Sequence, residues 1–136
     1  VVMPGPVRGT VASRAVHLDQ LGVEDLAILF DDMRGDLPGL AQAQAEIVAF
    51  AAERTRSTRL IVCPTYYSLD PVLDRVFGER PPDYLPTLGR LIEPAIHLMW
   101  TGDEVCSREF SPGALDRVAE QLGREPFLWD NYPVND

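Results

Sequence analysis

The stretch Phe127–Asp136, FLWDNYPVND, closes the chain with a short apolar run followed by Asp, Asn and Tyr residues. A continuous apolar run of this length is typical of a strand covered on both faces, as in a parallel sheet. Polar residues directly after such a strand mark the end at which α/β proteins build their sites. A complete doubly wound domain normally covers its last strand with a helix, so this ending predicts a piece cut from a longer barrel.

Apolar runs of the same kind recur upstream of this stretch. The last four begin at residues 26, 60, 95 and 127, which is an interval of 32 to 35 residues. The predicted strands are Val1–Met3, Leu26–Phe30, Leu60–Cys63, Ala95–Trp100 and Phe127–Trp129. Helical patterns lie between them, over Ser13–Leu21, Leu40–Arg54, Tyr84–Leu91 and from Ser111-Pro112 to the stop at Gly123. The alternation of strand and helix predicts an α/β fold with a parallel sheet.

The number of strands is compatible with two architectures. Five strands in 136 residues could form a complete flavodoxin-like sheet, or about five-eighths of a (β/α)8 barrel of roughly 250 residues. A phospho-acceptor receiver domain needs a Lys after a late strand, and all twelve basic residues of this chain are Arg. Neither the dinucleotide-binding glycine motif nor the P-loop motif occurs. The sequence therefore favours the partial barrel.

Composition narrows the classes of partner. The net charge of −9 argues against a nucleic-acid surface and against binding to anionic membranes. No apolar run approaches the roughly 20 residues of a membrane span. The two cysteines, Cys63 and Cys106, are too few for a disulfide scaffold and are expected to be buried free thiols. The two histidines, His17 and His97, fall in a predicted helix and a predicted strand, so a metal pair is not expected.

Five motifs, in order and in register, resemble glycoside hydrolase family 84, which comprises bacterial β-N-acetylglucosaminidases and protein O-GlcNAcases. They are LAILFDDM (Leu26–Met33), VCPTYYS (Val62–Ser68), YLPTLGRLI (Tyr84–Ile92), WTGDEVCS (Trp100–Ser107) and LWDNYPVND (Leu128–Asp136). The resemblance implies that residues 1–136 are the central part of one catalytic barrel, approximately strands 3 to 7. It also implies retaining removal of terminal β-linked N-acetylglucosamine, with the substrate's own acetamido group as nucleophile and no cofactor or metal.

The resemblance assigns the chemistry to two adjacent acids and a tyrosine. Asp31 would polarise the acetamido group and Asp32 would be the general acid/base. Neighbouring strand residues point to opposite faces, so both acids can share one pocket only if the backbone turns there. Tyr67 would reach the reacting centre. Relatives commonly have Glu at the position of Tyr66, so the sequence leaves open which tyrosine faces the pocket.

The remaining implied site residues bind the sugar. Trp129 and Val105 would line the pocket around the acetyl group, and Cys63 would lie beneath it. Asn131 would hydrogen-bond the acetamido or 3-hydroxyl region, and Asp136 would bind the 4- and 6-hydroxyls.

Other interpretations stay open at this point. The acid pair could be a helix N-cap. The chain could be a carbohydrate-binding half-barrel without turnover, or a metal-dependent hydrolase using Asp31, Asp32, Asp130 and Asp136. The expected partners are a glycoconjugate that contains N-acetylglucosamine and the rest of the barrel from the parent chain, with neither nucleic acid nor membrane. The isolated chain is expected to be a poor enzyme, because the family's glycine and lysine from the first two strands are absent from it.

Overall fold

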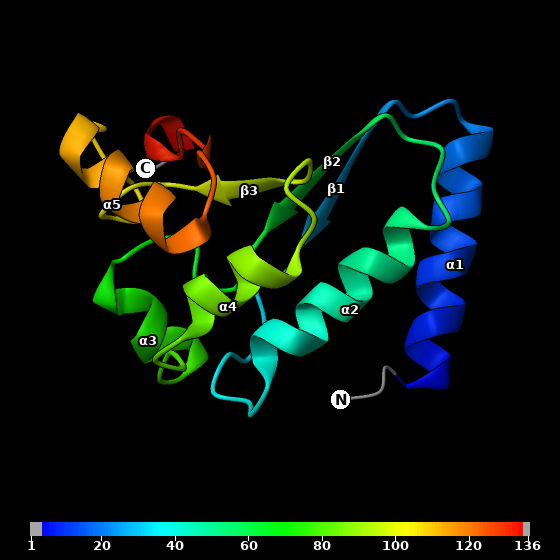
Figure 1. Cartoon of the computed structure of the whole chain (residues 1–136), viewed down its shortest axis with the longest axis horizontal. Helices are drawn as coiled ribbons and strands as arrows, with labels where there is room; N and C mark the ends of the chain where they lie inside the picture. Colours follow the sequence, from blue (N-terminus) through cyan, green and yellow to red (C-terminus); the bar gives the residue numbers. More distant parts are fainter. Residues whose placement is uncertain (1–3, 135–136) are drawn as a thin grey trace.

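The computed structural model describes residues 4–134, in which strands pair in parallel in the order of the sequence (Figure 1). The strands are β1 (Asp25–Leu29), β2 (Arg59–Cys63), β3 (His97–Trp100) and β4 (Phe127–Leu128). The register places Leu29 opposite Cys63 and Met99 opposite Phe127. Four of the predicted strands are confirmed within one or two residues at their ends. The fifth, Val1–Met3, lies outside the described residues.

The helices are α1 (Gly5–Gln20), α2 (Leu40–Ala52), α3 (Pro71–Phe77), α4 (Tyr84–Leu91) and α5 (Pro112–Leu122), followed by a 3₁₀ turn at Tyr132–Val134. The predicted bounds of α4 are confirmed, and so are the Ser111 cap and the left-handed Gly123 at the two ends of α5.

Two helix predictions were wrong. The first helix does not begin at Ser13 but at Gly5. Proline is well suited to a first helical turn, and this explains the early start. The sequence also gave no indication of α3, whose seven residues are too few for a helical period to be recognised.

The helices lie on one face of the sheet. In Figure 1, α1, α2, α4 and α5 follow one another around this face, each in contact with the next. On the opposite face Ala27 is exposed and Leu29 is 59% exposed. A doubly wound sheet carries helices on both faces and reverses its strand order at a switch point, whereas this sheet does neither. Strands in sequence order with helices on one side only are the arrangement of a (β/α)8 barrel.

The core fills the space between the sheet and the helices. Val62 and Leu98 point from the sheet and are fully buried, and they meet Val48 and Leu88 of the helix layer. The layer is tightly packed, because a Cβ on Gly89 of α4 would lie 2.2 Å from the carbonyl oxygen of Leu122 in α5. No helix of residues 4–134 combines the length and the apolar character needed to cross a membrane.

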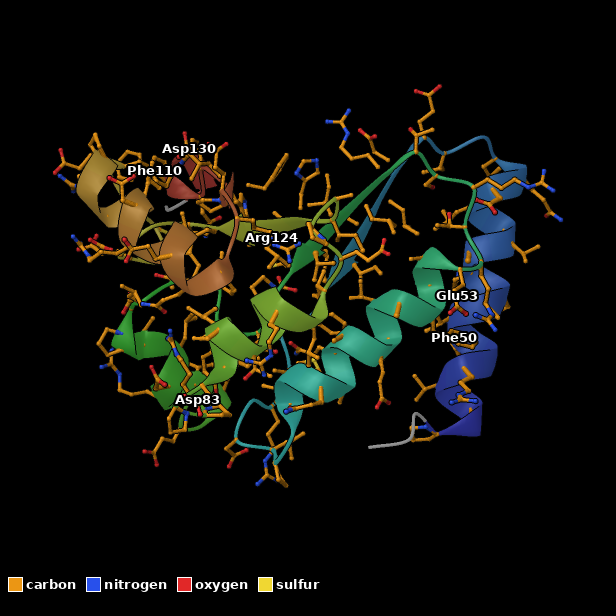
Figure 2. All side chains as sticks on the ribbon, in the orientation of Figure 1. Phe50, Glu53, Asp83, Phe110, Arg124 and Asp130 are labelled. Carbon is orange, nitrogen blue, oxygen red and sulfur yellow. The ribbon has the colours of Figure 1, made fainter. Side chains whose placement is uncertain are left out.

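Arg124 ties α4 to the turn that leads into β4 (Figure 2). Its guanidinium donates hydrogen bonds of 2.6–2.9 Å to four backbone carbonyls, those of Gly89, Ile92, Glu93 and Ile96. These carbonyls belong to α4 and to the segment between α4 and β3, where the helix leaves acceptors without partners. The side chain therefore fixes the end of α4 relative to the strands on either side of α5.

Candidate active site

The loops that follow the four strands meet at one edge of the sheet. Backbone pairing continues one residue beyond the strands, with Phe30 N to Cys63 O and Trp129 N to Trp100 O both at 2.9 Å. The loop after β3 is joined to the loop after β2 by Thr101 N to Tyr67 O, also at 2.9 Å. The loops therefore leave the sheet at fixed positions relative to one another.

The acid pair lies in a turn directly after β1. Asp31 is partly buried and Asp32 is exposed. In a strand, successive side chains point to opposite faces of the sheet. Asp31 and Asp32 lie in a turn, where this alternation does not apply, so both side chains can point toward one pocket. Within residues 4–134, no side chain or backbone group hydrogen-bonds to either carboxylate, so both are available to a ligand. The interpretation as a helix N-cap is wrong, since α2 begins only at Leu40 and Gly39 occupies its N-cap position.

Tyr67 lies against Trp129 and within electrostatic range of the acid pair. The two ring centroids are 5.4 Å apart with the planes inclined by 46°. Burial, with the neighbouring Cys63, Asp31 and Asp32, raises the pKa of the Tyr67 phenol to about 12. The hydroxyl therefore stays protonated at ordinary pH and can donate a hydrogen bond to a substrate.

Tyr66 points elsewhere. It is fully buried, its hydroxyl donates to Gly78 O at 2.6 Å, and its ring packs edge-on against Tyr84 with centroids 5.2 Å apart. A Cβ on Gly35 would collide with the Tyr66 ring, so the loop after β1 also closes over it. Of the two adjacent tyrosines, the one beside the acids is Tyr67.

The two cysteines differ in their surroundings. Cys63 is fully buried, and burial together with the charges of Asp31 and Asp32 raises the pKa of its thiol far above the ordinary value. A thiol in this state is not a nucleophile. Cys106 was expected to be buried but is only partly so, because it lies in the loop after β3 and not in a strand. Its sulfur accepts a hydrogen bond from Asn131 Nδ2 at 3.8 Å.

The side chain of Asn131 forms a hydrogen bond with the backbone of Val105. Asn131 Nδ2 donates to Val105 O at 3.2 Å, and its side-chain oxygen has no donor within residues 4–134 and can accept from a ligand. The Val105 side chain packs against the core together with Trp129. The structure thus brings Val105, Asn131, Trp129 and Tyr67 to one place, at the edge where Asp31 and Asp32 also lie. Asp136 lies outside the described residues.

A buried polar network beneath this site was missed by the sequence analysis. Gln44 Nε2 donates to Thr65 Oγ1 at 2.7 Å, and Thr65 Oγ1 donates to Phe30 O at 2.7 Å. The Tyr84 hydroxyl accepts from Thr65 N at 3.0 Å and donates to Gln44 Oε1. The network joins Phe30, which lies between β1 and Asp31, to the loop that carries Tyr67. A Gln on the apolar face of the Leu40–Arg54 pattern was the signal that could have revealed it.

The described residues contain no group of three or more His, Cys, Asp or Glu side chains that could hold a metal ion. His17 lies on α1 and His97 on β3, and both are exposed. Asp130 accepts a hydrogen bond from Tyr132 N at 3.3 Å in the turn after β4.

Comparison with known proteins gives this arrangement a family. The sequence profile of the β-N-acetylglucosaminidases matches residues 8–136. The chain belongs to this family. The resemblance to glycoside hydrolase family 84 is therefore confirmed, and the family profile covers nearly the whole chain.

Individual relatives agree in both sequence and fold. The chain is 29% identical over 139 residues to the protein O-GlcNAcases of Mus musculus and of Rattus norvegicus. It superposes with a TM-score of 0.81 and 33% identity on an O-GlcNAc hydrolase mutant of Thermobaculum terrenum, over 98% of this chain. The prediction of a partial (β/α)8 barrel is confirmed. The chain spans 14% of the length of each rodent relative and 30% of the bacterial structure.

Proposed function

We propose that residues 1–136 are the central part of a single catalytic barrel that removes terminal β-linked N-acetylglucosamine from glycoconjugates with retention. Family membership supports the substrate class. The observation that carries the proposal is the turn after β1, which presents two adjacent carboxylates that have no hydrogen-bond partner within residues 4–134, at the edge of the sheet that also holds Tyr67 and Trp129. The rest of the barrel comes from the parent chain.

The reaction uses the acetamido group of the substrate in place of a protein nucleophile. The acetamido carbonyl oxygen forms a bond to the anomeric carbon while the bond to the leaving oxygen breaks. Asp32, the more exposed acid, gives its proton to the leaving oxygen. Asp31, the more buried acid, accepts a hydrogen bond from the amide N–H and stabilises the positive charge that develops on the oxazoline ring.

In the second step Asp32 acts as the general base. A water molecule attacks the anomeric carbon, Asp32 takes its proton, and the bond between that carbon and the carbonyl oxygen breaks. The N-acetyl group is regenerated and the sugar keeps its β configuration. Two displacements on the same carbon give retention without a covalent enzyme intermediate.

The other side chains bind and orient the sugar. Tyr67, which stays protonated, donates to the reacting centre, and its ring forms one apolar wall with Trp129. Val105 closes the pocket around the acetyl methyl, over a base that includes the buried Cys63. Asn131 accepts from a sugar N–H or hydroxyl through its free oxygen. Asp136 binds the outer hydroxyls.

The proposal is tested with the full-length protein and phenyl N-acetyl-β-glucosaminide, whose poor leaving group needs acid assistance. We expect Asp32→Asn to lower kcat/KM by about 10²- to 10⁴-fold. The matched control is Asp130→Asn, an exposed acid after β4 whose replacement keeps an oxygen for the Tyr132 amide. Activity retained in Asp32→Asn would overturn the assignment. Loss of activity in the control, together with sensitivity to a chelator, would favour the metal-dependent alternative.

The intermediate is tested with substrates whose N-acyl group is fluorinated. Fluorine withdraws electrons from the carbonyl oxygen, so kcat should fall steeply from N-acetyl to N-trifluoroacetyl if this oxygen is the nucleophile. Proton NMR of the first product should show the β anomer. An α product, or a rate insensitive to fluorination, would exclude the oxazoline route. Sugar binding by calorimetry without any turnover would identify the carbohydrate-binding alternative.

A further inference from the structure

The backbone of Val105 is held from both sides by side chains of neighbouring loops. Its N–H donates to Asp70 Oδ2 at 3.2 Å, and its carbonyl accepts from Asn131 Nδ2 at 3.2 Å. Asp70 belongs to the loop after β2, Val105 to the loop after β3 and Asn131 to the segment after β4. We refer to these three residues as the Asp70–Val105–Asn131 bridge. It joins three consecutive loops across the wall of the candidate site.

Asp70 is itself held firmly. Its other carboxylate oxygen, Oδ1, accepts from Val72 N at 2.9 Å and so caps α3. Its backbone N–H donates to Ser68 Oγ at 3.1 Å, and Ser68 Oγ donates to Gly102 O at 2.9 Å. One carboxylate therefore serves two purposes, a helix cap with one oxygen and a contact to the next loop with the other. Because its main chain is also fixed, it can set the position of Val105.

The bridge lies where the loop after β3 meets the aromatic pair. Cys106, the residue after Val105, is close enough to Tyr67 to affect its pKa, and its sulfur also contacts Asn131. Val105 and Trp129 both pack at the margin of the core. A shift of the Val105 backbone would therefore change the width of the space beside the Tyr67–Trp129 pair.

We propose that Asp70 is a positioning residue that sets selectivity for the N-acyl group of the substrate, by fixing Val105 as one wall of the acyl pocket. The inference rests on the proposed function, which places the acetyl group beside Val105. An apolar pocket separates ligands that differ by one methylene by about 10- to 200-fold, provided that its walls do not yield. The loop after β3 keeps its attachments at Thr101 and Gly102 without the Asp70 contact, but the Val105 backbone is then held only by Asn131, and longer acyl groups are admitted.

The simpler interpretation is that Asp70 only caps α3. The variant Asp70→Ser separates the two roles, because Ser is a good N-cap but is too short to reach the Val105 amide as well. The second variant, Asp70→Asn, keeps the shape of the side chain. With its oxygen on Val72 N, it turns an NH₂ group toward the Val105 N–H. Both variants keep a cap and remove the contact.

The matched control is Ser111→Ala. Ser111 caps α5 at the far end of the same loop, accepting from Ala114 N at 3.3 Å, and none of the hydrogen bonds of residues 4–134 joins it to Val105. Ser111→Ala should remove a comparable helix N-cap without affecting the Asp70–Val105–Asn131 bridge. A general loss of stability would therefore appear in the control as well.

The experiment compares kcat/KM of the full-length protein for 4-nitrophenyl β-glucosaminides with N-acetyl, N-propionyl and N-butyryl groups. We expect both Asp70 variants to reduce the preference for N-acetyl over N-butyryl about tenfold or more, while Ser111→Ala keeps it within twofold of wild type. An equal loss for all three substrates would overturn the inference and leave Asp70 as a cap. Failure of the wild-type protein to hydrolyse any of them would instead overturn the proposed function, and the inference with it.

Discussion

Replacement of Arg124 by Met should destabilise the protein more than any other surface-accessible Arg replacement in this chain. Met keeps much of the apolar stem but removes the four hydrogen bonds to the carbonyls around the end of α4. Glu93 O also accepts from Ile96 N at 3.0 Å, but within residues 4–134 the other three carbonyls have no backbone donor that could replace the guanidinium. The change thus separates α4 from the turn before β4 without creating a large cavity.

The expected change in the free energy of unfolding is the difference between the hydrogen bonds that are lost and the cost of burying the guanidinium, which is relieved. A hydrogen bond from a charged donor is worth about 1.5–3 kcal/mol, so four bonds set an upper limit of about 6–12 kcal/mol. Burial opposes this gain, as shown by the lowered pKa of the Arg124 guanidinium. Within residues 4–134, its buried Nε also has no hydrogen-bond partner, at a cost of about 1–3 kcal/mol. Water can reach Glu93 O in the variant. We expect a net loss of about 2–4 kcal/mol.

The loss is measured by thermal unfolding of the full-length protein. In a barrel of about 250 residues, each kcal/mol lowers Tm by about 2–4 °C, so Tm should fall by about 4–16 °C. Arg124→Lys should fall between wild type and Arg124→Met, because a single ammonium nitrogen cannot replace two guanidinium nitrogens that each donate to two carbonyls. The control is Arg117→Met on the exposed face of α5, which should stay within about 0.5 kcal/mol of wild type. If Arg124→Met behaves like the control, or Arg124→Lys like wild type, the reasoning is wrong.

Three further predictions concern other buried groups. Tyr84→Phe leaves a buried amide and a buried side-chain oxygen without partners, so the free energy of unfolding from urea titration should fall by about 2–4 kcal/mol; a loss below 0.5 kcal/mol would contradict it. Gly89→Ala places a methyl 2.2 Å from Leu122 O and should cost about 1–3 kcal/mol or more by thermal unfolding, whereas Gly113→Ala in the open first turn of α5 should be neutral or stabilising. The raised pKa of Tyr67 means that the folded protein keeps a proton that the unfolded chain loses above pH 10, so stability should fall as pH rises from 10 towards about 12. Tyr67→Phe should make this decline shallower, and an unchanged slope in urea titrations at several pH values would count against the assignment.

The apolar runs were sufficient to locate the described strands, because strands of a parallel sheet are typically continuous apolar runs. The same reasoning located α4 and both ends of α5, where Ser111 and Gly123 have local conformations that depend on their own chemistry. It failed at α3, since Asp70-Pro71 begins a helix too short to show a period. It also misplaced the start of α1, which was predicted at Ser13 and lies at Gly5.

The family motifs named the candidate site residues, but they could not say which of two adjacent tyrosines lies beside the acids. That choice depends on contacts outside the local sequence, because Tyr66 donates to Gly78 O while Tyr67 contacts Trp129, which follows β4 and lies more than 60 residues away in the sequence. The sequence analysis required a backbone turn at Asp31 and Asp32, and only the three-dimensional structure could show that this turn is present.

The sequence by itself determined the strand and helix alternation, the family, and the residue types at the ends of the strands, because each of these is written in local pattern and spacing. The tertiary structure alone decided that the helices cover one face, that Gln44, Thr65 and Tyr84 form one buried network, and that Asp70 and Asn131 hold Val105 between them. The physical reason is that these features join residues from different βα units. Hydrogen bonds and burial across such distances arise only when the parallel sheet brings the carboxyl ends of its strands to one edge.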